Sequence, residues 1–136
     1  VEAAEKRKDA QTAREINISL PRELNNEQNW QLACDFVQKE FVSKGMIADV
    51  AFHRGHGGPD EEQPHMHVML TTRTVGPDGF GQKARLWNDK ALLMEWRRDW
   101  SAHCNERLAT LGFVFVTFLI ICLGLHNIKT CCYKML

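Results

Sequence analysis

The chain has 136 residues, enough for one domain with a modest core and too few for two. Its 44% hydrophobic and 25% charged residues are typical of an ordinary globular domain. Because 17 Lys and Arg residues balance 17 Asp and Glu residues, bulk charge does not indicate a nucleic-acid partner, although a basic groove can lie on a neutral protein. The five cysteines show no spacing typical of a zinc site or a disulfide framework, so we expect a reduced, cytoplasmic setting.

The N-terminal residues predict a helix followed by a strand. Residues 1–13 are rich in Ala, Glu, Lys and Gln, which favours a solvated helix. They lack both an initiator Met and an apolar signal segment, so we expect them to be the interior of a longer protein. Residues 15–20 then alternate polar and apolar side chains before Pro21, which predicts a half-buried strand.

A helix and a second strand follow. Asn25 or Asn26 supplies the N-cap, and Gly45 is a plausible C-terminal stop. Between them, apolar side chains recur at helical spacing: Trp30, Ala33, Cys34, Val37 and Phe41. Residues 46–53 predict the second strand.

The second half of the chain predicts a strand and a long helix separated by loops. Residues 54–64 form a polar loop, residues 65–72 alternate as a third strand, and residues 75–82 form a Gly-rich loop. The final helix spans roughly residues 91–108, with an apolar side made of Leu92, Leu93, Trp96, Trp100, Cys104 and Leu108.

The composition changes after this helix. Residues 111–125 are apolar or Gly apart from Thr117, without an amphipathic period. The run is short for a membrane span, which needs about 20 residues, but Lys129 and Lys134 suit a membrane-surface end. We expect one domain over residues 1–110 and, over residues 111–136, a tail unrelated to it, such as a frameshift or gene fusion produces. A functional membrane anchor through residues 111–125 is the open alternative.

Three histidines carry the chemistry that the sequence suggests. Residues two apart in a strand point to one face, so His65 and His67 project side by side. If the strands on either side of the 54–64 loop pair antiparallel, His53 joins them at one edge of the sheet. Three imidazoles can hold a divalent metal and leave open positions for a phosphodiester. The residues alone leave open whether this is a metal site or a set of surface histidines; His56, in the loop, and His103, on a helix, are weaker candidates.

The order of six blocks resembles the MobA/MobL relaxase family, to which the relaxase end of TraA-type conjugal transfer proteins belongs. The resemblance covers nearly all of residues 1–112. The blocks are AREINISLP at 13–21, the helix at 32–39, ADVAFH at 48–53, PHMHVMLTTR at 64–73, GFGQKARLWN at 79–88 and WRRDWSAHCNERL at 96–108.

The resemblance implies an α+β fold of the HUH endonuclease class, a two-layer sandwich in which an antiparallel sheet is flanked by helices and here lacks its N-terminal strand. It implies a divalent metal (Mn, Mg or Zn) held by His53, His65 and His67. Glu15 matches an acidic position that orients a ligand histidine, although a solvated charge at a strand edge is the plainer reading. The implied setting is the bacterial cytoplasm, and the implied partners are single-stranded DNA at an origin of transfer and the relaxosome proteins of plasmid mobilisation.

Relaxases of this family nick DNA by attack of a tyrosine hydroxyl, which forms a phosphotyrosyl link. Family members carry that tyrosine near the N-terminus, upstream of the matched blocks. The only tyrosine here is Tyr133, which matches no block. We therefore expect a truncated chain that binds metal without nicking DNA.

Single-strand binding needs cations along the backbone and flat groups for stacking. We expect these cations and flat groups to lie beside the edge of the sheet that carries His53, His65 and His67, the histidine edge. The candidates are Arg54, Arg73, Lys83, Arg85 and Trp87. Solvated loop charges, and a core position for Trp87, are the alternatives. Two other functions remain open: a small metal hydrolase that uses the same histidines on another substrate, and a non-catalytic, membrane-tethered remnant.

Overall fold

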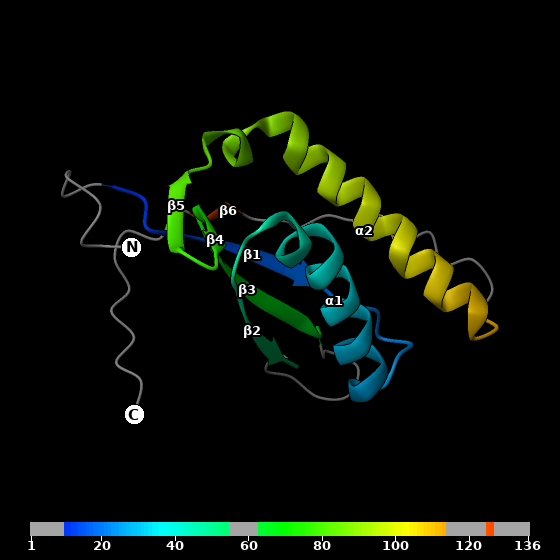
Figure 1. Cartoon of the computed structure of the whole chain (residues 1–136). Helices are drawn as coiled ribbons and strands as arrows, with labels where there is room; N and C mark the ends of the chain where they lie inside the picture. The colour runs from blue at the N-terminus through cyan, green and yellow to red at the C-terminus, as the bar shows by residue number, and fades with distance from the viewer. Residues whose placement is uncertain (1–9, 55–62, 114–124, 127–136) are drawn as a thin grey trace, which may run out of the picture.

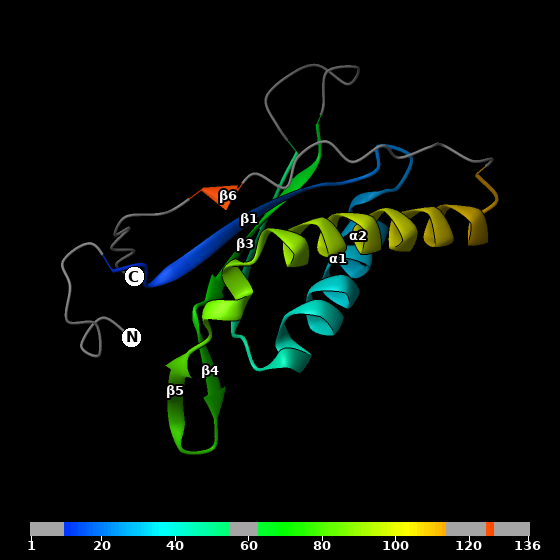
Figure 2. The same ribbon diagram turned by 90° about the horizontal axis from the view of Figure 1, so that it is seen from above.

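The computed structural model describes residues 10–54, 63–113 and 125–126. An antiparallel sheet of strand order β2-β3-β1-β6 is covered on one face by two helices (Figures 1 and 2). The strands are β1 (Ala13–Ser19), β2 (Ala48–His53), β3 (His65–Thr71) and β6 (Leu125–His126), and the helices are α1 (Asn26–Glu40) and α2 (Lys90–Thr110). This arrangement confirms the α+β sandwich of an antiparallel sheet flanked by helices.

The strand β3 pairs with β1 on one side and with β2 on the other. Its side chains alternate between a buried face, which meets the helices, and a half-exposed face. Met66, Val68 and Leu70 are at most 1% exposed and pack with Ile16 and Ile18 of β1. The opposite face therefore carries the polar residues of the same strands, the histidines among them.

The helix α1 starts where the sequence predicted but ends at Glu40, before the predicted stop at Gly45. The Asn25 Oδ1 accepts from the Gln28 N–H at 2.9 Å, and the Gln28 Oε1 accepts from the Asn25 N–H at 3.0 Å, which forms a capping box. The short 3-10 helix η2 (Val42–Lys44) follows and ends at Gly45, whose φ of 92° requires glycine. The predicted apolar stripe is only partly confirmed: Val37 is buried, whereas Trp30 is 42% exposed.

The helix α2 covers β1 with a row of buried residues at helical spacing: Trp96, Trp100, Cys104 and Leu108. The Trp100 ring lies edge-on to Phe36 at 5.0 Å between centroids, and Trp96 lies in the same way against Phe41. The Trp100 indole N–H also donates to the main-chain oxygen of Ser19 at 3.2 Å. The second helix is thereby fixed to the end of β1 that lies beside His65.

The Gly-rich segment predicted as a loop is instead a β-hairpin. The strands β4 (Arg73–Gly76) and β5 (Gly79–Lys83) pair antiparallel and project from the main sheet (Figure 2). Pro77 and Asp78 form the turn, and Gly79 takes a φ of 99°, which glycine allows at no steric cost. The prediction was wrong because Gly and Pro here mark a tight turn between two short strands. The 3-10 helix η3 (Arg85–Asn88) connects the hairpin to α2.

Two predictions concern the ends of the chain. Residues 1–9 of the predicted N-terminal helix lie outside the described residues, while residues 10–12 are not helical and Ala13 begins β1. Most of the apolar run, residues 114–124, also lies outside them. Within the described part of the chain, neither helix combines the length and apolarity that a bilayer crossing needs.

The two tryptophans of α2 offer a matched test of this packing. Both are 1% exposed, but Trp96 Nε1 has no hydrogen-bond acceptor among the described residues, whereas Trp100 Nε1 donates to Ser19. We expect Trp100→Phe to lower the free energy of unfolding by about 1 kcal/mol more than Trp96→Phe, because only the former breaks a hydrogen bond. Urea denaturation measures both values, and an equal or larger loss in Trp96→Phe would contradict the assigned contact.

Candidate functional site

The open face of the sheet brings the three predicted histidines together. His53 is the last residue of β2 and pairs with His65, the first residue of β3, while His67 follows two residues later on the same face. The ring centroids lie 5.5 Å apart for His53 and His65, 5.0 Å for His53 and His67, and 5.1 Å for His65 and His67. The predicted meeting of these side chains at one edge of the sheet is therefore found.

Hydrogen bonds determine which ring nitrogens face outward. The His67 Nδ1 lies 2.5 Å from the Glu15 Oε1, and the His65 Nδ1 lies 2.8 Å from the main-chain oxygen of Gln63. A carbonyl or carboxylate oxygen only accepts, so each Nδ1 carries the proton in these two hydrogen bonds. In the neutral form of such a ring the lone pair is on Nε2, the arrangement found where metal-binding histidines have a supporting acceptor.

Glu15 reaches His67 diagonally across the β1–β3 ladder. It stands opposite Met69, whereas His67 stands opposite Asn17. Diagonal neighbours on one face of a sheet are within reach of long side chains. The carboxylate therefore comes from the residue to which the family resemblance assigned an orienting role.

The three imidazole rings are neighbours, but their present arrangement is not that of a metal-coordination site. Among the described residues, no group of three or more His, Cys, Asp or Glu side chains is arranged, as it stands, so that it could hold a metal ion. Metal–nitrogen distances of about 2.0–2.1 Å bring two ligand rings to within roughly 5 Å of each other. The ring centroids of His53, His65 and His67 are separated by similar distances, 5.0–5.5 Å.

One of the predicted DNA-binding residues lies at this edge. Arg54 follows His53 directly, and its Nε donates to the Asn26 Oδ1 at 2.7 Å. This bond connects the end of β2 to the first residue of α1. No local sequence pattern predicts this bond, because the two residues lie 28 positions apart.

The other four predicted DNA-binding residues lie elsewhere. Arg73 and Lys83 belong to the hairpin and Arg85 and Trp87 to η3, all of which follow the far end of β3. At about 3.3 Å per residue, the six steps from His65 to Thr71, the last residue of β3, span roughly 20 Å. Placing these four beside the histidines was therefore wrong, because β3 carries the chain across the whole sheet before they occur.

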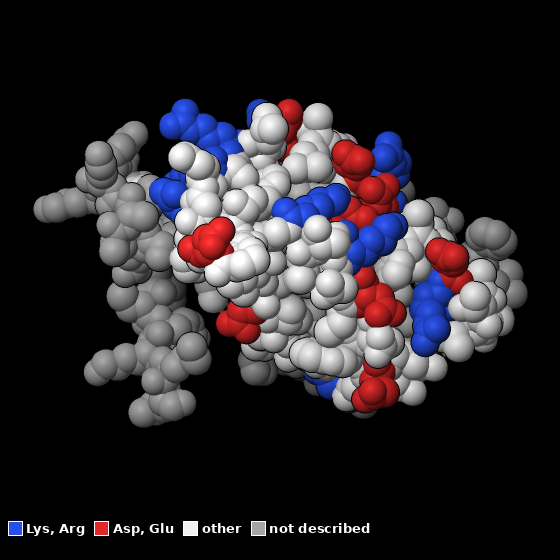
Figure 3. All heavy atoms as spheres, in the orientation of Figure 1, with Lys and Arg blue, Asp and Glu red and all other residues white. Residues whose placement is uncertain are grey.

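Three of these four side chains have other contacts in the fold. The Arg73 guanidinium donates to the main-chain oxygen of Gly81 at 3.1 Å, and the Lys83 ammonium donates to that of Gln11 at 2.7 Å. Trp87 packs against the hydrophobic core, and Arg85 is exposed. On the face drawn in Figure 3, basic and acidic side chains are interspersed, in keeping with the zero net charge.

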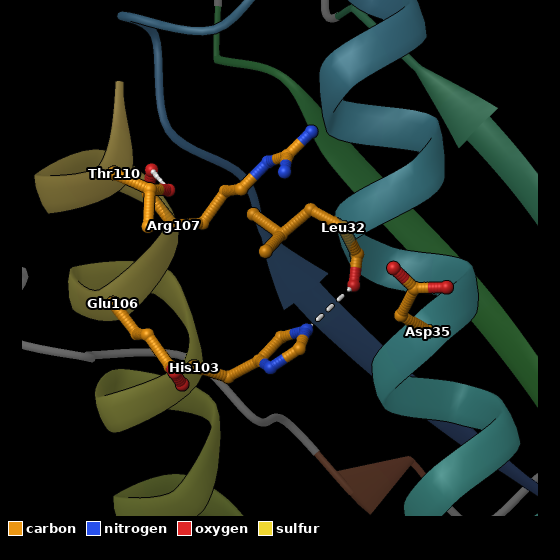
Figure 4. Close-up of a pocket in the computed structure, with 6 residues that line it drawn as sticks. All are labelled: Leu32, Asp35, His103, Glu106, Arg107 and Thr110. Atoms are coloured by element: carbon orange, nitrogen blue, oxygen red, sulfur yellow. Dashed lines mark hydrogen bonds between the residues drawn. The ribbon is translucent and has the colours of Figure 1, made fainter.

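A separate cavity of about 260 Å³ lies between α1 and α2, in the helical layer (Figure 4). It is lined by Leu32, Asp35, His103, Glu106, Arg107 and Thr110. His103 Nε2 lies 3.1 Å from the main-chain oxygen of Leu32, which gives this histidine a structural contact away from the open face. His56 and Tyr133 lie outside the described residues.

The two cysteines in the described helices do not add a reactive group. Burial raises the pKa of the buried Cys104 thiol, and burial together with the negative charge of Asp35 raises the pKa of Cys34. A thiol with a raised pKa stays protonated at neutral pH and is a poor nucleophile. The histidine edge therefore remains the candidate site.

Known proteins share both the sequence and the fold. The MobA/MobL family model matches residues 1–114. The "Conjugal transfer protein TraA" of Agrobacterium fabrum is 52% identical over 83 residues, which cover 61% of this chain and 7% of that protein. The "43 kDa relaxation protein" of Salmonella typhimurium is 38% identical over 119 residues, which cover 71% of this chain and 32% of that protein.

A solved structure from a study of the molecular basis of vancomycin resistance transfer in Staphylococcus aureus superposes with a TM-score of 0.73 at 34% identity. The match covers 85% of this chain and 60% of that one. The chain thus spans less than two thirds of each of these relatives. The family model covers most of the chain, so the chain belongs to the MobA/MobL family of mobilisation and relaxation proteins.

Proposed function

We propose that this chain provides the metal-binding and single-stranded-DNA-binding part of a conjugative relaxase of the HUH class. The observation that carries the proposal is the meeting of His53, His65 and His67 on the open face of the sheet, with ring centroids 5.0–5.5 Å apart. Membership of the MobA/MobL family supports a role in conjugative DNA processing in general. The substrate proposed is single-stranded DNA at an origin of transfer, in a complex with the other relaxosome proteins.

The donor set suits a divalent transition-metal ion such as Mn or Zn better than Mg, which prefers oxygen ligands. Neutral imidazole nitrogens are good ligands for transition metals, and three protein ligands leave open positions for substrate oxygens. The hydrogen bonds of His65 and His67 through Nδ1 leave Nε2 of both rings available for a metal. When bound, the metal would supply Lewis-acid polarisation of a phosphodiester.

The protein groups around the histidines orient rather than react. Glu15 accepts from the His67 Nδ1–H and so holds that ring in one tautomer with Nε2 outward. Arg54, at the same edge, is a cation suited to a DNA phosphate. A DNA contact by the hairpin residues Arg73 and Lys83 requires a strand that runs along the sheet to its other end.

Cleavage needs a nucleophile in addition to these groups. The family resemblance assigns that role to a tyrosine, and none occurs in residues 10–54 or 63–113. We propose that the 136-residue chain binds metal and DNA but forms no covalent link. No observation on the described residues favours a hydrolase of another substrate or a membrane-tethered remnant.

Metal binding is tested by titration calorimetry of the full chain with Mn²⁺ and Zn²⁺. We expect His53→Ala, His65→Ala and His67→Ala each to weaken binding by more than the roughly 10- to 100-fold that loss of a supporting partner costs. His103→Ala, on α2, is the matched control and should leave the affinity unchanged. Equal affinity in all four variants would rule out the proposed ligand set.

Glu15 is tested by two substitutions that separate orientation from stability. We expect Glu15→Ala to raise the metal Kd by about 10- to 100-fold, because the His67 ring loses its fixed tautomer. Glu15→Gln keeps an acceptor oxygen and should recover part of the affinity. If both variants bind metal as tightly as the unaltered chain, Glu15 has no orienting role.

The absence of a covalent step is tested with a labelled oligonucleotide that contains a relaxase nick site. We expect the chain to shift the oligonucleotide in a native gel and to give no labelled protein band after denaturation, because no tyrosine lies among the described site residues. A second chain that carries an upstream tyrosine segment from a MobA/MobL relative is the positive control. A covalent adduct formed by the 136-residue chain itself would overturn the proposal.

A further inference from the structure

Trp30 stands apart from the other tryptophans of the chain. Trp96 and Trp100 are each 1% exposed, and Trp87 packs against the core. Trp30 instead exposes 42% of its surface, although its helix buries Leu32, Ala33, Phe36 and Val37 against the sheet. The sequence pattern includes Trp30 in the apolar stripe of α1 and so predicts burial. The structure shows instead that this side chain is exposed.

The position of Trp30 on α1 places it near the histidine edge. Residues four apart on a helix lie on one side, about 5–6 Å apart at Cβ, so Trp30 is one turn along from Asn26. Long side chains on a helix lean toward its N-terminus, which directs the Trp30 indole toward Asn26. Asn26 in turn accepts a hydrogen bond from Arg54, the residue after His53.

Three kinds of group therefore follow one another along this side of the molecule. The imidazoles come first, at the ends of β2 and β3. The Arg54 guanidinium comes next, held at 2.7 Å by Asn26, and the exposed indole of Trp30 follows one helical turn further on. A single strand of nucleic acid binds to cations along its backbone and to flat aromatic groups on which its bases stack. Arg54 and Trp30 supply one of each beside the proposed phosphodiester site at the histidines.

We propose that Trp30 is a stacking platform for a base of the single strand whose backbone passes Arg54 and the histidine edge. The inference rests on the proposed function and deepens it by naming a residue that holds the strand beside the site. Stacking on an indole uses the π-face that every base has, so this contact favours single-stranded over paired DNA without selecting a sequence.

The test measures binding of a short fluorescein-labelled thymidine oligonucleotide to the full chain by anisotropy. We expect Trp30→Ala to raise the Kd by about 5- to 100-fold, the usual cost of losing one stacked base, and Trp30→Phe to restore most of the affinity. Phe80→Ala is the matched control, because Phe80 is 51% exposed on the hairpin at the other end of β3 and should be out of reach of a short strand.

A second readout uses intrinsic fluorescence with an unlabelled oligonucleotide. Stacking of a base on Trp30 quenches its emission, whereas Trp96 and Trp100 are buried and Trp87 packs against the core in η3, which follows the far end of β3. DNA should therefore quench the unaltered chain and leave Trp30→Phe largely unquenched. Because Trp30 and Phe80 are both exposed, we expect Trp30→Ala, Trp30→Phe and Phe80→Ala to keep the melting temperature of the unaltered chain.

The outcomes separate this inference from the function on which it rests. If the unaltered chain binds DNA and Trp30→Ala binds equally well, the platform is overturned while the proposed function stands. An equal loss in Trp30→Ala and Phe80→Ala also overturns it, because the effect is then not specific to the histidine edge. If the unaltered chain binds no single-stranded DNA, both proposals fail.

Discussion

The antiparallel register of β3 with its two neighbours is the constraint on which the site depends. His65 stands opposite His53 on one side and Ser19 on the other, and the two-residue alternation of a strand places His67 beside His65. A shift of either pairing by one residue would turn the histidines into the core and expose Met66 and Val68. The buried apolar face therefore fixes the positions of the polar groups opposite it. The energy that selects the register comes from hydrophobic burial, not from the histidines themselves.

The two helices that cover the buried face of the sheet stabilise this register. Met66, Val68 and Leu70 belong to the same core cluster as aromatic side chains of both helices, and the Trp100 indole N–H donates to the Ser19 oxygen at the end of β1 next to His65. At the other side of the same edge, Arg54 connects the end of β2 to the start of α1. The strand ends that carry the histidines are thus connected to both helices through Arg54 and Ser19. Such support suits a site whose rings need to be held close together before a ligand arrives.

The sequence allowed much of this to be predicted. The period of two in residues 15–20 and 65–72, and the period of 3.6 in residues 91–108, predicted β1, β3 and α2, because burial on one face leaves a regular pattern. The meeting of His53 with His65 followed from one assumption, that the flanking strands pair antiparallel. The hairpin was missed because its glycines and its proline are as typical of loops as of tight turns.

The side chains away from the strands were harder to place. Arg73 and Lys83 lie close to His67 in sequence but at the far end of β3, and the contact of Arg54 with Asn26 joins elements whose relative position no local pattern encodes.

The central claim is that His53, His65 and His67 share one divalent ion. Paramagnetic line broadening by substoichiometric Mn²⁺ in the amide spectrum of the full chain tests it most directly, because broadening falls off steeply with distance from the ion. The account predicts that the amide signals of His53, His65 and His67 and of the adjoining β1 residue Ser19 are lost first, while those of His103 and the hairpin persist. Broadening centred on the cavity between α1 and α2, or loss of signals without any focus, would contradict it.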